Sequence, residues 1–298
     1  MGESFVNIGE ILQSLRKYKG MSLADLAEDI CTVEELTLIE KNKQVPTIDE
    51  LFRLANKLNV NLSDFFDFTS ADSISYVSAV SGLIKKFKRD RNYQAIYEIV
   101  QREKNNPLFN FSSSKQYLLW HEAICLYYLA SPKEREKEKS IQMLIEAIEM
   151  TNPSKKGLTE QEIEIKMSIA LIEKDDANVK QAIVLLKEIL DDIEKLPSLA
   201  DPHIRLRALF GLSQSLAKIG EYEQSLHYSE KGIQQCINDE VLYLLGEFLY
   251  QSAFNNIELG IKDKAIEYLT KSHNVFTLQQ NKKFIKLVES GMEILSKQ

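Results

Sequence analysis

Apolar side chains recur every three or four residues along most of the chain, which is the spacing of one buried face of an α-helix. Between Ile8 and Phe66 this pattern divides into five short helices. Three of them begin with a capping box, in which a hydroxyl residue is followed three positions later by an acidic one: Ser22 with Asp25, Thr32 with Glu35, and Thr47 with Glu50. The segment is therefore predicted to be a five-helix unit.

A tight turn joins two of these short helices, which is the helix-turn-helix arrangement. Its second helix, about Val33 to Asn42, is the one that such motifs place in the DNA major groove. The same segment carries Arg16, Ser22, Leu26, Ala27, Ile30, Ile39, Glu40 and Pro46. With these residues it resembles the Cro/phage-repressor type, also called the XRE family. The resemblance implies a helix-turn-helix DNA-binding domain over residues 1–68.

The candidate DNA-binding residues fall into two groups. Those on the outer side of the second helix are expected to face base edges: Thr32, Val33, Glu34, Thr37 and Leu38. Those near the ends of the motif are expected to flank the groove: Arg16, Lys19, Ser22, Lys41 and Lys43. Glu34 would accept a hydrogen bond from a cytosine amino group, and Val33 or Leu38 would touch a thymine methyl group. The chain departs from the family at Leu23 and Leu38, where Gln and Arg are common.

A small polar segment, 69–75, is predicted to be a linker, and a longer repeat follows it. Five positions recur at spacings of 44, 42, 43 and 40 residues: Ile96, Ser140, Ala182, Ser225 and Ala265. A large apolar residue follows each of them four positions later, except that Ser229 stands in the fourth repeat. This recurrence is typical of stacked helical hairpins. We expect hairpins at 76–101, 115–150, 160–196, 202–236 and 241–273, and a terminal helix at 281–296.

The fourth hairpin contains Leu209, Leu212, Leu216, Gly220, Tyr222, Ser225 and Gly232. In this stretch it resembles the tetratricopeptide (TPR) pattern, although its period exceeds the usual length of about 34 residues. The resemblance implies a right-handed TPR-like α-solenoid over residues 76–298, whose concave surface can hold an extended peptide. The expected fold class is thus all-α, with a Cro/lambda-repressor-like domain followed by this solenoid.

Composition agrees with a helical, soluble chain but charge argues against strong DNA binding. Of the 298 residues, 44% are apolar and 27% are charged, and only 11 glycines and 6 prolines are available for turns. The net charge is −7, and residues 1–70 hold seven basic against twelve acidic side chains. Because counterion release from phosphate contacts supplies much of DNA affinity, we expect binding that is weak for each domain and depends on a dimer.

The sequence offers no catalytic motif. It contains no glycine-rich phosphate loop, nucleophile elbow or pair of catalytic carboxylates, so we expect no enzyme and no cofactor. His121 and Cys125 lie four residues apart, and core packing is favoured over a metal site for them because further ligands are missing. Three cysteines, Cys31, Cys125 and Cys236, fit reduced buried thiols. With no apolar membrane span, the chain is expected to be cytoplasmic.

The combination of both regions resembles the RNPP group of peptide-sensing regulators from Gram-positive bacteria. Stretches that carry this likeness include Ile8–Gly9, Glu28–Cys31, Ala55–Leu58, Tyr93–Tyr97 and Tyr222–Leu226. It implies a quorum-sensing transcriptional regulator that binds promoter DNA as a homodimer. A short secreted and re-imported signalling peptide would occupy the concave face and shift the population of dimer arrangements. RNA polymerase is a further implied partner, and no membrane partner is expected.

The same resemblance implies a set of peptide-binding residues. Two basic residues before Tyr93, Arg89 and Arg91, stand where the family has peptide-contacting lysines, and either form a carboxylate clamp or mark an exposed helix end. Gln251 is implied as a groove residue, and Asn255 lies one turn further along. Phe284 replaces an aromatic of the last helix, Phe66 completes the set, and Gly211 stands where the family has an Asn.

Two other functions compete with this interpretation. One is a TPR protein-interaction module whose helix-turn-helix no longer binds DNA, which the acidic first 70 residues favour. The other is a peptide-controlled phosphatase or phosphatase inhibitor, which no catalytic residues support.

Overall fold

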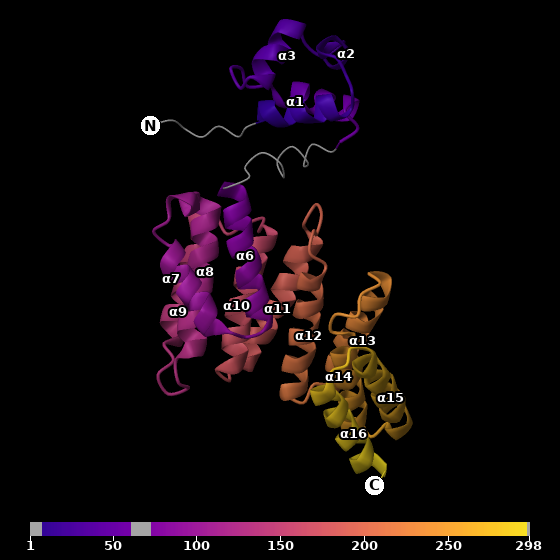
Figure 1. The fold of residues 1–298 in the computed structure, drawn as a ribbon. Coiled ribbons are helices and arrows are strands. Elements are labelled where there is room, and N and C mark those ends of the chain that lie inside the picture. The colour runs from indigo at the N-terminus through magenta and orange to yellow at the C-terminus, as the bar shows by residue number, and fades with distance from the viewer. Residues whose placement is uncertain (1–7, 61–72, 297–298) are drawn as a thin grey trace. The chain divides into compact units, whose positions relative to one another are not determined.

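The computed structural model describes residues 8–60 and 73–296, and within these ranges every regular element is a helix and no strand occurs (Figure 1). The all-α fold with an N-terminal helix-turn-helix and a helical solenoid is confirmed. Contacts divide the chain into two compact units, Met1–Arg89 and Asp90–Gln298. In the described part, no helix is long and apolar enough to cross a membrane.

The first unit begins with α1 (Ile8–Tyr18), α2 (Leu23–Ala27), α3 (Val33–Glu40) and α4 (Ile48–Lys57). All three predicted capping boxes are formed, with Ser22, Thr32 and Thr47 as the caps. In each, the hydroxyl oxygen accepts from the backbone three residues later, and the acidic side chain accepts from the backbone N–H of the cap. Local sequence therefore sets the starts of α2, α3 and α4. The fifth short helix predicted near Phe66 lies outside the described residues.

The core of this unit is small and closely packed. It is built from the buried side chains of Leu12, Leu26, Leu36, Ile39 and Leu54, with further apolar residues around them. Gly9 of α1 lies so close to α3 that an added Cβ would overlap the carbonyl oxygen of Ile39. Only glycine leaves room for this close approach. The start of α1 therefore packs directly against the last turn of α3.

The remaining helices follow the expected order. α6 begins at Ser73, inside the segment expected to be a linker, and ends at Arg89. After it come α7 (Tyr93–Glu103), the short 3₁₀ helix η1 (Pro107–Phe109), α8 (Ser112–Leu129), α9 (Lys137–Thr151), α10 (Glu160–Asp175), α11 (Val179–Glu194), α12 (His203–Lys218), α13 (Tyr222–Asn238), α14 (Leu245–Glu258), α15 (Lys262–Leu278) and α16 (Lys282–Ser296).

The repeat positions found in the sequence are core positions. Ile96, Ser140, Ala182, Ser225 and Ala265 lie on α7, α9, α11, α13 and α15, and all five are buried. The residues four positions later are buried as well, including Ser229, which broke the apolar pattern. Each repeat thus buries the same two positions of its second helix, as expected for a stack in which neighbours share a core.

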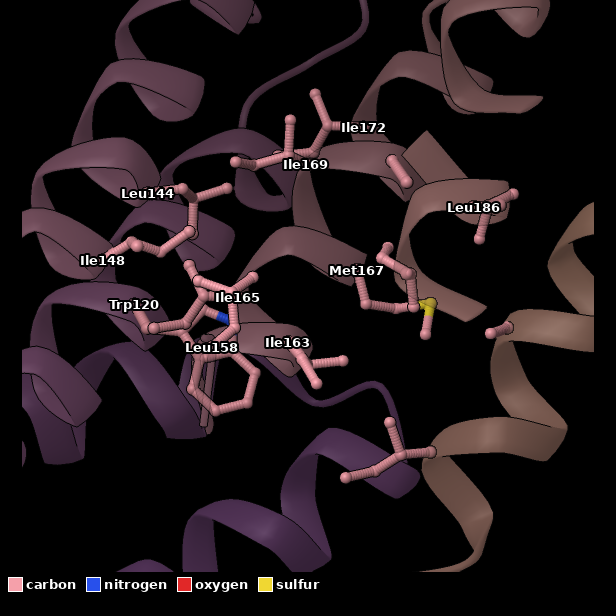
Figure 2. Packing of buried hydrophobic residues seen from close by; sticks show 14 of the residues in the cluster. Trp120, Leu144, Ile148, Leu158, Ile163, Ile165, Met167, Ile169, Ile172 and Leu186 are labelled. Carbon is pink, nitrogen blue, oxygen red and sulfur yellow. The ribbon is translucent and has the colours of Figure 1, made fainter. Parts of the chain in front are cut away.

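The largest core of the second unit extends from α8 to α12. Trp120, Leu144, Ile163, Ile169 and Leu186 belong to one continuous apolar cluster (Figure 2). The Trp120 indole is buried and donates a hydrogen bond to the Ser168 hydroxyl, with 2.8 Å between Nε1 and Oγ. Because its one polar atom has a partner, this Trp can be buried without a desolvation penalty.

Packing from α12 to α15 adds small and polar residues to two smaller apolar clusters. Ser213 of α12 and Ser225 of α13 donate to each other's carbonyl oxygens at 2.9 and 2.8 Å. Ser252 of α14 donates to the Ser229 hydroxyl at 2.8 Å. At Gly232 of α13, an added Cβ would overlap the ring of Phe248. The same holds at Gly246 of α14, where an added Cβ would overlap the ring of Phe276. These helices therefore approach closely through hydrogen-bonded serines and two glycines.

The first helices of successive hairpins form one side of the stack. α8, α10, α12 and α14 pack directly on one another in addition to packing on their own hairpin partners. We call these four helices the inner row. Closer spacing on one side curves a stack of hairpins toward that side, so the inner row is the concave face expected from the TPR pattern.

The sequence interpretations of Cys and His hold for most residues. Cys125 and Cys236 are buried free thiols, whereas Cys31 is half-buried. Burial raises the pKa of Cys125 and of Cys236 to about 12. His121 is buried between the rings of Tyr117 and Trp120, and its Nδ1 lies 2.8 Å from the Tyr117 carbonyl oxygen. His121 and Cys125 are therefore core residues, as predicted. Across residues 8–60 and 73–296, no His, Cys, Asp and Glu group has metal-ligand geometry.

Candidate DNA-binding and peptide-binding surfaces

The outward face of α3 gathers the residues expected to face base edges. Val33, Glu34, Thr37 and Leu38 line one shallow depression, and Thr32 is exposed at the helix cap beside it. Val33 and Leu38 are 41% and 39% exposed although both are apolar. The face thus combines methyl groups with hydrogen-bonding side chains, which are the two kinds of contact that distinguish base pairs in the major groove.

The opposite face of α3 is fixed by an internal ion pair. The Arg16 guanidinium binds both oxygens of Glu40, with Nε to Oε1 at 2.6 Å and Nη2 to Oε2 at 2.8 Å. Arg16 also donates from Nη1 to the Met21 carbonyl at 3.0 Å. The hydrogen bonds that Arg16 donates to Glu40 raise the pKa of Arg16. A bidentate pair of this kind restricts the rotation of α3 against α1.

This geometry changes the expected role of Arg16. Its side chain is 11% exposed, and two acceptors from the protein already engage its guanidinium. A phosphate contact would require Arg16 to leave Glu40 with a buried, unpaired charge, which is costly. We therefore assign Arg16 to positioning α3. Sequence reasoning missed this pair because Glu40 lies 24 residues away and carries no local signal.

The other candidate phosphate contacts are accessible. Lys19, Lys41 and Lys43 are exposed, and none is paired with a carboxylate within the described residues. Ser22 is exposed too, but its hydroxyl donates to Asp25 at 2.6 Å as part of the capping box. The backbone N–H and hydroxyl of Ser22 therefore already form hydrogen bonds at the start of α2.

Acidic side chains share this surface with the lysines. Hydrogen bonds from Ser22 and its backbone lower the pKa of Asp25, and equivalent bonds from Thr32 lower the pKa of Glu35. Both carboxylates are consequently ionised at neutral pH and lie at the starts of α2 and α3. They satisfy helix N-termini that would otherwise attract phosphate. The negative charge seen in the sequence therefore lies on the candidate DNA-binding surface itself.

In the second unit, α14 contributes a buried polar pair to the inner row. Gln251 donates from Nε2 to the Asn255 Oδ1 at 3.2 Å, and both residues are less than a tenth exposed. Within the described residues, Asn255 Nδ2 is buried without a hydrogen-bond partner. A buried donor without a partner is unusual in a folded protein. The structure thus brings these two predicted groove residues together.

The other predicted peptide-binding residues are spread over several elements. Arg89 is exposed at the end of α6, and Arg91 is exposed in the turn before α7 at a φ of 53°. Phe284 of α16 stacks on Phe276, with ring centroids 4.8 Å apart, and so packs within the C-terminal core. Phe66 lies outside the described residues.

Arg91 lies near a group of residues that the sequence did not single out. Tyr93 stacks on Tyr128 of α8 with ring centroids 4.7 Å apart, and the Tyr128 hydroxyl donates to Asp175 at 3.0 Å. Burial lowers the pKa of Lys174, Asp175 opposes this shift, and Lys218 and Arg91 add to it. Lys174 and Lys218 are 44 residues apart, which matches the repeat spacing. This spacing was the signal by which the sequence could have predicted that the two lysines lie on neighbouring repeats.

Lys174 and Lys218 lie near the C-terminal ends of α10 and α12, and an ion pair joins the N-terminal ends of the same two helices. Arg207 of α12 and Glu164 of α10 form an ion pair with 3.0 Å between Nη2 and Oε1. Arg207 also lies 3.7 Å from Asp201, so its charge is compensated by two carboxylates. The two ends of this concave surface therefore differ: Arg207 is paired with acids, whereas Lys174 is not.

Several solved structures resemble the chain. PlcR from Bacillus thuringiensis, in complex with the peptide PapR7 and DNA, has a TM-score of 0.78 and 21% identity over 97% of this chain and 98% of that one. ComR from S. thermophilus, in complex with DNA and its signalling peptide ComS, has a TM-score of 0.65 and 15% identity over 97% and 99%. The SHP pheromone receptor Rgg2 from Streptococcus dysgalactiae has a TM-score of 0.65 and 14% identity over 95% and 98%. At these identities the likeness establishes a shared fold.

Sequence profiles carry the assignment further. No curated protein matches the chain. Residues 12–65 match a helix-turn-helix family, which covers α2 and α3. Residues 81–292 match the C-terminal domain of the RNPP family, which is most of the chain and includes the whole inner row. With a helix-turn-helix preceding that domain, the chain belongs to the RNPP family.

Proposed function

We propose that this protein is a quorum-sensing transcriptional regulator that binds promoter DNA as a dimer and responds to a short signalling peptide. The observation that carries the proposal is the outward face of α3, which presents Val33, Glu34, Thr37 and Leu38 together on a chain that also contains an RNPP C-terminal domain. Related folds were determined with DNA and a peptide bound, as in PlcR and ComR. Such a regulator acts in the cytoplasm, and contact with RNA polymerase is part of the proposal.

The peptide is assigned to the inner row. The pair Gln251 and Asn255 on α14 supports this choice, because Asn255 Nδ2 has no hydrogen-bond partner within the described residues. Since Asn255 is fully buried, a carbonyl of a bound chain would reach this donor only after neighbouring side chains move. Arg91 at the other end of the row supplies a positive charge for a carboxylate. An extended peptide on this face would contact several repeats at once and favour one curvature of the stack over another.

A TPR interaction module that no longer binds DNA is the second candidate function. Glu34 on the outward face of α3 favours it, together with the ionised carboxylates of Asp25 and Glu35 beside that face. These charges oppose phosphate. The two candidates differ in whether any duplex binds through α3.

DNA-binding assays with duplexes that tile the region upstream of the gene separate the candidates. Gel shifts at low salt should detect binding by the full chain, and synthetic peptides from neighbouring short reading frames should change its affinity. The double variant Lys41→Ala/Lys43→Ala should weaken binding and reduce the salt slope by about two, since each phosphate contact contributes about one. Lys264→Ala, an exposed lysine of α15, is the matched control. Absence of binding to every duplex, with and without peptide, would favour the interaction module.

A further inference from the structure

A cavity of about 530 Å³ is lined by residues of α11, α12 and α13, a volume within the range of small-molecule sites. From α12 it receives Arg205 and Leu209, which lie one turn apart on the same face of that helix. Arg207 of the concave surface lies on roughly the opposite side of α12. The cavity is therefore on the side of the solenoid away from the surface to which the peptide is assigned, and we call that side the back.

The floor of the cavity is apolar. Helix α12 packs on both α11 and α13, and Leu190, Leu209 and Tyr228 contribute one side chain from each of the three helices. All three belong to or pack against one apolar cluster, in which Leu209 is 5% exposed. A ligand that covers this floor would remove apolar surface from water.

Positive side chains stand around the floor. Lys187 lines the cavity from α11 and Lys231 from α13. Within the described part of the chain, neither lysine has a carboxylate partner, and Lys231 Nζ lies 5.8 Å from the centre of the Tyr228 ring. Of the two acids that line the cavity, Asp191 pairs with Lys195 at 2.5 Å.

Arg205 supplies a third positive charge from the centre of the cavity. Its side chain is 27% exposed and forms one ion pair, with 3.3 Å between Nη1 and Oε1 of Glu194. Among the described residues, its guanidinium makes no hydrogen bond, and Nε is fully enclosed without a partner. A ligand would therefore contact the outer nitrogens. A largely buried guanidinium without any hydrogen bond is unusual in a folded protein.

The preceding repeat satisfies its charges at the same positions. Forty-three residues before Arg205 and Leu209, at the spacing of these repeats, stand Glu162 and Lys166 of α10. Glu162 is 2% exposed and accepts three hydrogen bonds. Lys166 pairs with two carboxylates of α11, at 2.8 and 3.0 Å. Charges on the back of α10 are thus fully engaged within the protein, whereas Arg205 of the next repeat is not.

Water alone does not match the arrangement as well as an anion does. Water fills a polar cavity of this size when no ligand is bound, and it would solvate Arg205. It would not neutralise Lys187 and Lys231, and it would leave the apolar floor wet. An organic anion meets both demands, because its charged group pairs with the cations while its apolar part covers the floor.

We propose that this cavity binds a small organic anion, in which a carboxylate or phosphate group is attached to an apolar ring or chain. Arg205, Lys187 and Lys231 hold the charged group, and the floor holds the apolar part. The site does not depend on the proposed function. A ligand in contact with both α11 and α13 links two neighbouring hairpins and stabilises one spacing between them.

Photo-crosslinking tests the location and the charge of the ligand together. The full chain is irradiated with 4-benzoylbenzoate, an aromatic carboxylate, or with 4-benzoylphenyl phosphate, and the cross-linked residues are mapped by mass spectrometry. The neutral 4-benzoylbenzamide is the reference. At least one anionic probe should label the segments 187–194, 205–209 and 228–238 several-fold more than the amide does.

Variants test the three cations. The variant Lys187→Gln/Arg205→Gln/Lys231→Gln should be labelled about tenfold less by that anionic probe. Its matched control, Lys180→Gln/Lys262→Gln/Lys264→Gln, removes the same charge from exposed positions of α11 and α15 and should be labelled normally. Because Arg205 is largely buried, Lys187→Gln/Lys231→Gln is included as a variant that changes exposed residues alone. It should be labelled several-fold less than the wild type.

Each outcome bears on the site. Stronger labelling by one of the two anionic probes supports it and identifies the charged group that it prefers. Equal labelling of the cavity segments by both anions and the amide would overturn the anion site. Wild-type labelling of the two cavity variants, or equal losses in the cavity and control triple variants, would overturn it as well.

Discussion

The Arg16 guanidinium and the Glu40 carboxylate form a bidentate ion pair that joins α1 to the last turn of α3. Their side chains are 11% and 3% exposed, so this pair is largely removed from water. Both residues are among those by which the sequence resembles the Cro type. Their structural role is to hold α3 so that Val33, Glu34, Thr37 and Leu38 face outward.

Removing one partner of this pair should loosen α3. Arg16→Met leaves the Glu40 charge buried and unpaired, which typically costs about 3–5 kcal/mol. Hydrogen exchange of the full chain should show faster exchange in α1 and α3, with α8 to α12 unchanged. The double variant Arg16→Met/Glu40→Leu removes both charges and should recover part of the protection. If Arg16→Met exchanges like the wild type, the pair does not hold α3.

Variants at two capping boxes of the same geometry allow an effect on stability to be distinguished from an effect on DNA recognition. Thr32→Ala and Thr47→Ala each remove a cap hydroxyl, at a cost of about 1 kcal/mol of local stability. Only Thr32 lies at the start of the helix that is expected to meet DNA. Anisotropy titrations should therefore show a loss of affinity for Thr32→Ala that exceeds the loss for Thr47→Ala. Equal losses would mean that the cap of α3 acts through folding alone.

Close packing at Gly232 gives a test of the solenoid. An alanine there would overlap the Phe248 ring, and overpacking of a core typically costs about 1–3 kcal/mol. Gly232→Ala should lower the thermal unfolding temperature, and the added variant Phe248→Leu should restore part of it by making room. Gly82→Ala is a suitable control, because no atom lies near its added Cβ. A stable Gly232→Ala chain would show that α13 and α14 are further apart than described.

Thiol reactivity should rank the three cysteines. The thiolate is the reactive form, and at pH 8 a thiol with a pKa of about 12 is ionised to about one part in ten thousand. Iodoacetamide should therefore modify half-buried Cys31 first, and Cys125 and Cys236 only after unfolding. Alkylation of Cys125 in the folded chain at the rate of Cys31 would contradict its burial.

The same thiols make stability depend on pH. Their folded-state pKa is raised, so the folded chain binds more protons than the unfolded chain between about pH 9 and pH 12. Stability should fall as pH rises through this interval. Cys125→Ala should make the fall shallower, as followed by urea unfolding at several pH values.

Local signals in the sequence predicted much of the fold. Ser22, Thr32 and Thr47 reach their partners within three residues, so their caps could be read directly. The hairpins followed from spacing, because Ser140, Ala182 and Ala265 recur with the stack. Arg16 could not be assigned in this way, since its partner is distant in sequence and the residue type fits a phosphate contact equally well.

The concave surface was less predictable than the helices. Lys174 and Lys218 share the repeat spacing, but their meaning depends on which helices form the inner row and on where Glu173 and Asp176 find partners. Neither fact has a local pattern. Gln251 came from resemblance to a family and Asn255 from its position one helical turn further along, and the structure adds that the two are hydrogen-bonded and buried.

Selection from a pool of random DNA duplexes tests the central claim most directly. The full chain should enrich a two-fold related sequence whose half-sites lie about one helical turn, or a multiple of it, apart, as expected for a helix-turn-helix dimer. The variant Glu34→Ala/Thr37→Ala, which changes only the outward face of α3, should alter or lose that preference. Recovery of no enriched sequence at low salt, or of the same sequence by the variant, would contradict DNA recognition through α3.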